Sequence, residues 1–303
     1  MPDSRYSDKQ SRQSIFDELL WAKEIEMKKN SLQILVSSVN KDAEKLIQEM
    51  NIQTDAIIVN QVQKKDGEFE FSSNIEDERN YFYSGFSIKV FNRKEKGVGL
   101  SRNTALEASD HDLIQFADDD IVYDRGYPEL VVKEFENHPE ADILLFNVKA
   151  QEGRETYWNN NYSKVSWYNY GRYPAYAICA KREKIEAAGI RYSLLFGGGA
   201  PHMNGEDSLF LHDCLEKGLK IYRTSVQIGH EKAGESTWFK GYTDKFFYDR
   251  GVLYHFLYGK MAKVWGLRFL IKNRNTMCAE KGLVSCFKLL SDGIKYGRTL
   301  KKI

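Results

Sequence analysis

Short apolar runs alternate with longer amphipathic stretches along most of this 303-residue chain. Strands buried in a parallel sheet form short, nearly continuous apolar runs, whereas helices that cover the sheet carry an apolar stripe. The alternation is typical of an α/β fold with a mostly parallel central sheet. The pattern predicts strands at residues 32–36, 56–59, 86–91, 113–117, 143–147 and 225–228, and helices at 42–50, 99–109, 128–137 and 208–215.

The pattern also divides the chain into three predicted parts. Residues 1–30 are predicted to form an accessory helix, residues 31–237 carry the alternation, and residues 238–303 form a basic, aromatic-rich helical segment. From Lys240 onward, 14 Lys and Arg residues accompany four acidic residues, a net charge of +10, which leaves −9 for the rest of the chain. Such a division of charge indicates that the last segment has a partner of its own.

The composition is that of an ordinary globular protein, with 42% hydrophobic and 29% charged residues. No stretch approaches the roughly 18 apolar residues of a membrane span, and no signal-peptide pattern opens the sequence. We therefore expect a cytoplasmic protein. The cysteines form no CxxC pair and are expected to be buried free thiols: Cys179, Cys214, Cys278 and Cys286.

Polar side chains follow four of the predicted strands. In open α/β sheets, ligands bind beyond the carboxyl ends of the strands, where the strand order reverses. The sequence therefore predicts a ligand site built from these strand ends: Ser38 and Asn40, Asn60 and Gln61, Asn92 and Arg93, and the triplet Asp118, Asp119 and Asp120.

The acidic triplet directly follows the apolar run 113–117. Three adjacent carboxylates repel one another, and a divalent cation removes this repulsion. Mg²⁺ and Mn²⁺ prefer carboxylate oxygens and also bind substrate phosphates. The triplet therefore indicates a metal site, and the alternative is a solvated acidic turn or a helix cap.

Two further elements carry candidate chemistry. Glu206 and Asp207 open a helix, where the helix dipole stabilises negative charge, so capping of that helix is one interpretation. The other is that a carboxylate accepts a proton from an attacking hydroxyl. His230 follows a short strand in a glycine-containing loop, and it is either structural or a ligand of a metal or diphosphate.

A glycine-containing loop, residues 96–103, leads into the predicted helix 99–109. It is not a dinucleotide-binding fingerprint, because Arg102 stands where the third glycine belongs. A glycine loop that opens a helix with Arg102 and Asn103 suits close packing beneath a nucleotide or its phosphates.

In this order and spacing, the elements resemble the family 2 glycosyltransferases, which have a GT-A fold. The resemblance spans about residues 31–235 and rests on residues 34–39, 60–61, 97–106, the DxD motif 118–120 and the ED motif 206–207. It implies a nucleotide-diphospho-sugar donor, expected to be a UDP-sugar. The residues that would hold it are Ser38, Asn40, Asn60, Gln61, Arg102, Asn103, Asp118, Asp119 and Glu206.

The resemblance also implies the chemistry. Asp207 would be the general base, Asp120 would bind Mn²⁺ or Mg²⁺, and His230 would complete the metal site. The acceptor would be a glycan or a polyprenyl-diphosphate-linked saccharide, glycosylated with inversion during surface polysaccharide synthesis. The chain departs from the family pattern at residues 38–40 and at residues 60–62, where an acid-rich segment is usual.

Two other functions are compatible with parts of the pattern. A sugar nucleotidyltransferase would carry a glycine-rich basic loop after the first strand, and residues 37–42 lack it. A degenerate GT-A fold could bind sugars or partners without catalysis, and the departures at residues 38–40 and 60–62 are its only support, but the carboxylates of the DxD and ED motifs are all retained.

The basic C-terminal segment suits docking on an anionic membrane surface at the inner face of the cell membrane. The alternative is a set of helices packed on the core, with a solvated basic face. Nucleic-acid binding is disfavoured because the rest of the chain is acidic and shows no recognition motif.

Overall fold

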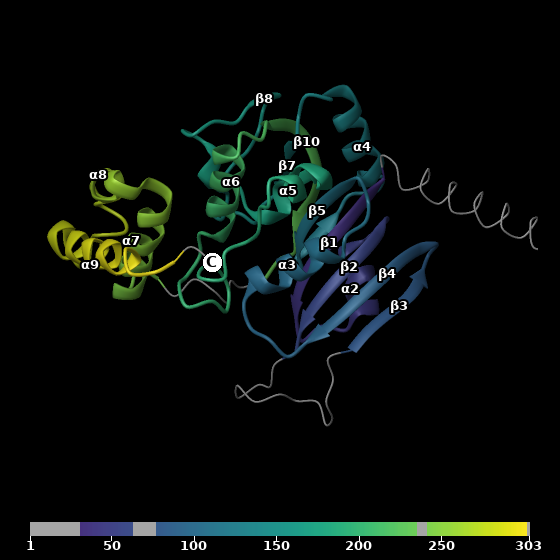
Figure 1. The fold of residues 1–303 in the computed structure, drawn as a ribbon, viewed down its shortest axis with the longest axis horizontal. Coiled ribbons are helices and arrows are strands. Elements are labelled where there is room, and N and C mark those ends of the chain that lie inside the picture. Colours follow the sequence, from purple (N-terminus) through teal and green to yellow (C-terminus); the bar gives the residue numbers. More distant parts are fainter. Residues whose placement is uncertain (1–30, 63–76, 235–240, 302–303) are drawn as a thin grey trace, which may run out of the picture.

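The structure, a computed structural model, describes residues 31–62, 77–234 and 241–301 (Figure 1). The described residues form a ten-stranded sheet with helices on both faces, followed by a group of helices near the C-terminus. The predicted α/β class with C-terminal helices is therefore confirmed. The accessory helix predicted for residues 1–30 lies outside the described residues.

The strands run in the spatial order β3-β4-β2-β1-β5-β9-β7-β10-β6, and β8 pairs with β10. Neighbours among β4, β2, β1 and β5 are parallel, as are β7 and β10, whereas β3, β6, β8 and β9 pair antiparallel. The sheet is therefore mixed. The strands are β1 (Leu32–Val39), β2 (Asp55–Gln61), β3 (Asp77–Tyr83), β4 (Phe86–Arg93), β5 (Leu113–Asp118), β6 (Ile121–Tyr123), β7 (Ile143–Lys149), β8 (Ser163–Lys164), β9 (Ile178–Lys181) and β10 (Ile221–Glu231).

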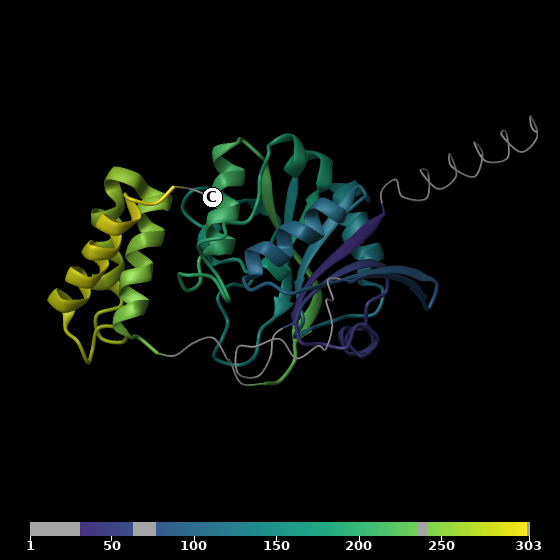
Figure 2. The ribbon, with the colours of Figure 1, turned by 60° about the horizontal axis from the view of Figure 1, so that its bottom comes forward.

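Helices cover both faces of the sheet, with α2 and α3 on opposite sides (Figure 2). The α-helices are α2 (Ala43–Met50), α3 (Val98–Ala108), α4 (Tyr127–Asn137), α5 (Arg182–Ala187), α6 (Glu206–Glu216), α7 (Asp244–Tyr258), α8 (Ala262–Lys272) and α9 (Leu283–Gly297). Short 3₁₀ helices span Tyr170–Arg172, Ala175–Ala177 and Gly259–Met261. Each predicted helix between residues 42 and 215 is present within two residues of its predicted bounds.

The order of the strands reverses between β1 and β5. The chain builds outward from β1 through β2 to β4, and then returns to place β5 on the other side of β1. At the carboxyl ends, Ser37 lies opposite Asp118, and Ser38 lies opposite Asn60. The strand ends that the sequence selected therefore meet at one edge, where α/β folds bind ligands.

The C-terminal helices α7, α8 and α9 pack around an apolar core of their own, separate from the core of the sheet. We refer to these three helices as the C-terminal bundle. Phe246, Phe247 and Tyr254, aromatic residues of the basic segment, are buried in this core. Val252 and Leu253 of α7 pack with Leu209 of α6, so the bundle lies beside α6 (Figure 1).

Helices α7 and α9 approach so closely that only glycine fits at their crossing. A Cβ atom on Gly293 would lie 1.9 Å from the carbonyl oxygen of Tyr248, and one on Gly251 would lie 2.0 Å from that of Leu290. Because these neighbours are backbone atoms, the helices themselves would have to separate. Small residues at a helix crossing thus set the geometry of the C-terminal bundle.

Substitution of Gly293 by alanine is accordingly expected to lower the free energy of unfolding by about 1–3 kcal/mol, the usual cost of overpacking. Urea denaturation followed by circular dichroism measures this change. Gly234→Ala is the control, because a Cβ there meets no atom within 4 Å. Equal stability of the two variants would contradict the close crossing.

No helix among the described residues is both long and apolar enough to cross a membrane.

Candidate active site

Arg102 joins the two acidic motifs. Its Nη2 lies 2.8 Å from Oδ1 of Asp118, and its Nη1 lies 2.7 Å from Oδ1 of Asp207 and 3.5 Å from Oε1 of Glu206. The Arg102 side chain is 3% exposed. Its guanidinium lies 4.9 Å from the centre of the Tyr192 ring, and this contact fixes the plane of the guanidinium, whose two terminal nitrogens form a fork between the two motifs. A single buried cation therefore brings residues 105 positions apart into one site.

Glycines place α3, and with it Arg102, against the segment that precedes α6. Val98 donates a backbone hydrogen bond to the carbonyl of Gly198 (2.8 Å). A Cβ on Gly197 would lie 2.8 Å from the carboxyl carbon of Glu206, and φ at this glycine is +104°. A side chain there would therefore be strained and would push Glu206 away from Arg102. The two glycine-containing segments are what allow α3 and α6 to meet at the site.

Asp207 lies in the first turn of α6, where the dipole favours its charged form, and it accepts a hydrogen bond from the Ala175 backbone. Burial, together with the negative charges of Glu206 and Asp118, nevertheless raises its pKa to about 8. Arg102 opposes the rise, but one guanidinium cannot offset three carboxylates. Asp207 is thus a carboxyl group that can exchange a proton near neutral pH.

The acidic triplet lies at the end of β5 and in the turn before β6. Partial desolvation, together with the charges of Asp118, Asp119 and Glu231, raises the pKa of Asp120 to about 6. Burial also raises the pKa of Asp119, against the lowering effect of Lys41. Among the described residues, Asp120 therefore has no cation beside it, unlike Asp118 with Arg102 and Asp119 with Lys41, and carboxylate oxygens are the donors that a hard divalent cation prefers.

Several predicted donor-binding residues form hydrogen bonds within the protein. Asn60 donates from Nδ2 to Asn92 Oδ1 (2.9 Å) and to the Lys41 carbonyl (3.0 Å), and Ser38 Oγ donates to Asn60 Oδ1 (3.3 Å). Gln61 donates to the Gly97 carbonyl (2.8 Å) and accepts from its N–H (3.2 Å). These contacts shape the carboxyl edge of the sheet.

Asn103 and Asn40 also have clear local roles. Asn103 Nδ2 donates to the Tyr192 carbonyl (2.9 Å), and its Oδ1 accepts from the Tyr192 N–H (2.8 Å). Asn40 is exposed, has φ of +51° and donates its backbone N–H to the Gln61 carbonyl (3.1 Å). Direct contact of these two residues with a donor stays a prediction, as it does for Ser38, Asn60 and Gln61.

His230 lies in β10, opposite Val122 of β6. Its side chain is 49% exposed, and its Nδ1 is 3.9 Å from Oδ1 of Asp124. The described residues contain one group of three side chains whose ligand atoms converge as metal ligands do, and it includes neither Asp120 nor His230. A shared metal site at Asp120 and His230 therefore stays a prediction.

One residue beside the triplet, Glu231, could not be singled out from the sequence. Glu231, which follows His230 in β10, accepts hydrogen bonds from Tyr176 Oη (2.6 Å) and from the Gln151 N–H (3.0 Å). Its carboxylate adds to the charge that raises the pKa of Asp120. Only the pairing of β10 with β6 brings it there, and the one available signal was its place next to His230.

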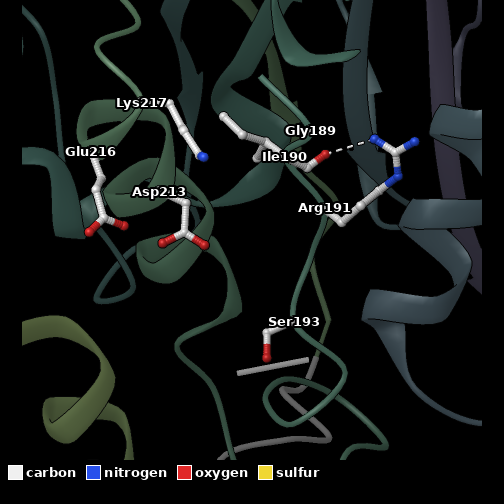
Figure 3. A pocket seen from close by; sticks show the side chains of 7 residues that line it. All are labelled: Gly189, Ile190, Arg191, Ser193, Asp213, Glu216 and Lys217. Atoms are coloured by element: carbon white, nitrogen blue, oxygen red, sulfur yellow. Dashed lines mark hydrogen bonds between the residues drawn. The ribbon is translucent and has the colours of Figure 1, made fainter. Parts of the chain in front are cut away.

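A shallow pocket of about 200 Å³ lies away from these acids, at the C-terminal end of α6 (Figure 3). It is lined by Asp213, Glu216 and Lys217 on one side and by Gly189, Ile190, Arg191 and Ser193 on the other. Asp213 and Glu216, together with His212, form the group of convergent ligand atoms noted above. The pocket contains none of the triplet or ED residues, so it is not the site that Arg102 assembles.

The fold is of the GT-A type. The crystal structure of S. aureus TarS residues 1–349 in complex with UDP-GlcNAc superposes with a TM-score of 0.56 at 12% identity, over 81% of this chain and 73% of that one. The complex of the same fragment with UDP gives 0.54 at 13% identity, over 81% and 72%. The longer TarS structure superposes with a TM-score of 0.50 at 12% identity, over 81% of this chain and 43% of that one. This likeness shows the fold.

The sequence comparison covers part of the chain. The profile of glycosyl transferase family 2 matches residues 73–189, a stretch that includes Arg102 and the acidic triplet but ends before Asp207. No curated protein matches the chain. The match over these residues agrees with the sequence motifs and supports a glycosyltransferase.

Proposed function

We propose that this enzyme transfers a sugar, with inversion, from a UDP-sugar to a hydroxyl of a glycan or lipid-linked saccharide during surface polysaccharide synthesis. The observation that carries the proposal is the Arg102 fork, which holds Asp118 at 2.8 Å and Asp207 at 2.7 Å. It joins the motif expected at the donor diphosphate to the carboxylate expected at the acceptor. The TarS complexes with UDP-GlcNAc and UDP support a uridine donor.

In this mechanism Asp207 accepts the proton of the acceptor hydroxyl. The acceptor oxygen forms a bond to C1 of the sugar as the bond from C1 to the diphosphate oxygen breaks, and the bonding electrons leave with UDP. Because the attack is on the face opposite the leaving group, the configuration at C1 inverts. Arg102 and the Ala175 N–H hold the Asp207 carboxylate in one orientation for this transfer.

Asp120 is the residue we assign to a Mn²⁺ or Mg²⁺ ion, with His230 as a second ligand. The raised pKa of Asp120 and the surrounding carboxylates fit a site that a cation neutralises. The ion, when bound, offsets the charge that develops on the leaving diphosphate. Asp118 and Asp119 then face the ribose and sugar of the donor.

A location at the inner face of the cell membrane is part of this proposal. A lipid-linked acceptor presents its saccharide at the membrane surface, and the C-terminal segment carries a net charge of +10 from Lys240 onward. Anionic lipids attract such basic segments.

Replacement of Asp120 by alanine is the test of the donor site. We expect the variant to lose the Mn²⁺-dependent part of UDP binding, a loss at least as large as the roughly 10–100-fold that removal of an outer-shell partner costs a metal site. Calorimetric titration of UDP with and without Mn²⁺ measures it.

Asp213→Ala is the matched control, because Asp213 belongs to the convergent group on α6. Its UDP binding should equal that of the wild type. If Asp213→Ala removed the metal dependence and Asp120→Ala did not, the metal assignment would be wrong. If the wild type bound no nucleotide diphosphate, a sugar-binding or partner-binding module would replace the transferase proposal.

A further inference from the structure

The outward face of α8 carries an unpaired apolar stripe. Val264, Leu267 and Ile271 are 57%, 39% and 47% exposed, and they follow the spacing i, i+3, i+7 of one helix face. Ala262, Gly266 and Leu270, on the opposite face, are buried in the C-terminal bundle. The stripe is therefore not part of the bundle core. Aromatic residues of the basic segment, such as Phe246, Phe247 and Tyr254, are buried in that core instead.

Cations line the apolar stripe on both sides. With 3.6 residues per turn, Lys263 lies along one edge of the stripe, and Arg268 and Lys272 lie along the other. All three are exposed. No Asp or Glu occurs between Asp249 and Glu280, so this part of the sequence has no charge that balances them. An apolar stripe between two basic edges is the pattern of a helix that lies in a lipid–water interface.

We propose that this α8 face, defined by Val264, Leu267, Ile271 and their flanking cations, docks on an anionic lipid surface. The apolar side chains enter the boundary between headgroups and acyl chains, while Lys263, Arg268 and Lys272 extend to the phosphates. The inference deepens the proposed function, since it rests on an acceptor presented at a membrane, and it names the surface that makes the contact.

Charge argues against a second copy of this chain as the occupant. A twofold contact through α8 would place Lys263, Arg268 and Lys272 close to the same cations of the partner, and like charges across an interface are unfavourable. The position of the C-terminal bundle suits lipid docking, because Figures 1 and 2 place it at the end of the molecule opposite β3 and β4.

Co-sedimentation of the full chain with vesicles tests the proposal. We expect binding to vesicles of phosphatidylcholine with phosphatidylglycerol, weak binding to phosphatidylcholine alone, and a decrease with added salt. The double variant Val264→Glu, Ile271→Glu should bind more than about tenfold more weakly, since it loses two apolar contacts and adds two repelled charges. Lys263→Gln with Lys272→Gln should lose about fivefold for each cation removed.

Leu130→Glu on α4 is the matched control, because Leu130 is an apolar residue of similar exposure (41%) outside the C-terminal bundle. It should bind vesicles as the wild type does. Equal binding by the α8 variants, or no preference for anionic vesicles, would overturn the proposal. So would a wild-type dimer, seen by analytical ultracentrifugation, that Val264→Glu with Ile271→Glu dissociates.

The same proteins separate this inference from the proposed function. Mn²⁺-dependent UDP binding, measured without vesicles, should be unchanged in the α8 variants. Vesicle binding without any UDP binding would refute the transferase proposal and leave the docking surface in place. UDP binding without vesicle binding would refute the docking surface and leave the transferase proposal in place.

Discussion

Replacing Asp207 by asparagine is expected to lower kcat by about 10²–10⁴-fold, the usual contribution of a positioned acid or base. The amide keeps the shape of the carboxylate but cannot accept the proton of the acceptor hydroxyl. UDP binding should persist, because Glu206 and Asp118 remain paired with Arg102. Release of UDP from a UDP-sugar measures turnover, and titration calorimetry measures UDP binding.

The pH profile adds an independent test of the same residue. A base must be deprotonated to act, and burial raises the pKa of Asp207 to about 8. In the wild type, kcat/KM should therefore increase with pH through this value and level off above it. The residual activity of Asp207→Asn should lack this ascending limb.

Glu206→Gln is the matched control for Asp207→Asn, since both acids lie in the first turn of α6 and face Arg102. Glu206 lies 3.5 Å from the guanidinium, whereas Asp207 lies at 2.7 Å. We expect Glu206→Gln to retain most of kcat at saturating UDP-sugar, and to retain the ascending limb of the pH profile. If the two variants exchanged these behaviours, Glu206 would be the base and our assignment would be wrong.

The parallel part of the sheet could be predicted because its strands are buried on both faces. Each of β1, β2 and β7 contains a continuous apolar run, and in β5 one buried polar residue, Gln115, interrupts the run. Such runs identify strands without knowledge of their neighbours. Strand β3 was missed because it lies at the sheet edge, pairs only with β4 and has a largely polar sequence, DERNYFY. Strand β9 was missed because four residues between β5 and β7 carry little pattern.

The candidate site could be predicted only as far as strand ends determine it. The rule for parallel sheets places Ser38, Asn60 and Asp118 at one edge, and the register confirms that their strand ends adjoin. The pairing of Arg102 with Asp207 follows instead from packing between α3 and α6. No spacing rule in one sequence relates positions 105 residues apart.

Amide side chains show another limit of the sequence. Asn60, Gln61 and Asn103 have the donors and acceptors that a nucleotide needs, but the same groups bind the backbone of neighbouring loops. Composition and position do not distinguish these uses, because both occur at the ends of strands and the starts of helices. The sequence therefore identified the right edge of the sheet without determining what each amide contacts.

Loss of the Arg102 cation is expected to have the largest effect on stability. Arg102→Met would leave Asp118, Glu206 and Asp207 close together without their shared partner, and breaking a buried ion pair in this way costs about 3–5 kcal/mol. Arg102→Lys should recover only part of the lost stability. An ammonium group cannot contact Asp118 and Asp207 at once as the two guanidinium nitrogens do. Urea denaturation measures the free energy of unfolding of the wild type, Arg102→Met and Arg102→Lys.

The pH dependence of this loss identifies its cause. Burial raises the pKa of Asp207, and Arg102 opposes this rise. Without the cation the folded-state pKa of Asp207 lies further above its unfolded value, so its ionisation opposes folding more strongly. The deficit of Arg102→Met should therefore be largest above pH 7 and shrink as the pH falls and the acids become protonated. Arg191→Met is the control, because Arg191 is 40% exposed and its ion pair with Glu107 is worth at most about 1 kcal/mol. A deficit of Arg102→Met that stayed constant with pH would show that packing on Tyr192, rather than charge, is what Arg102 contributes.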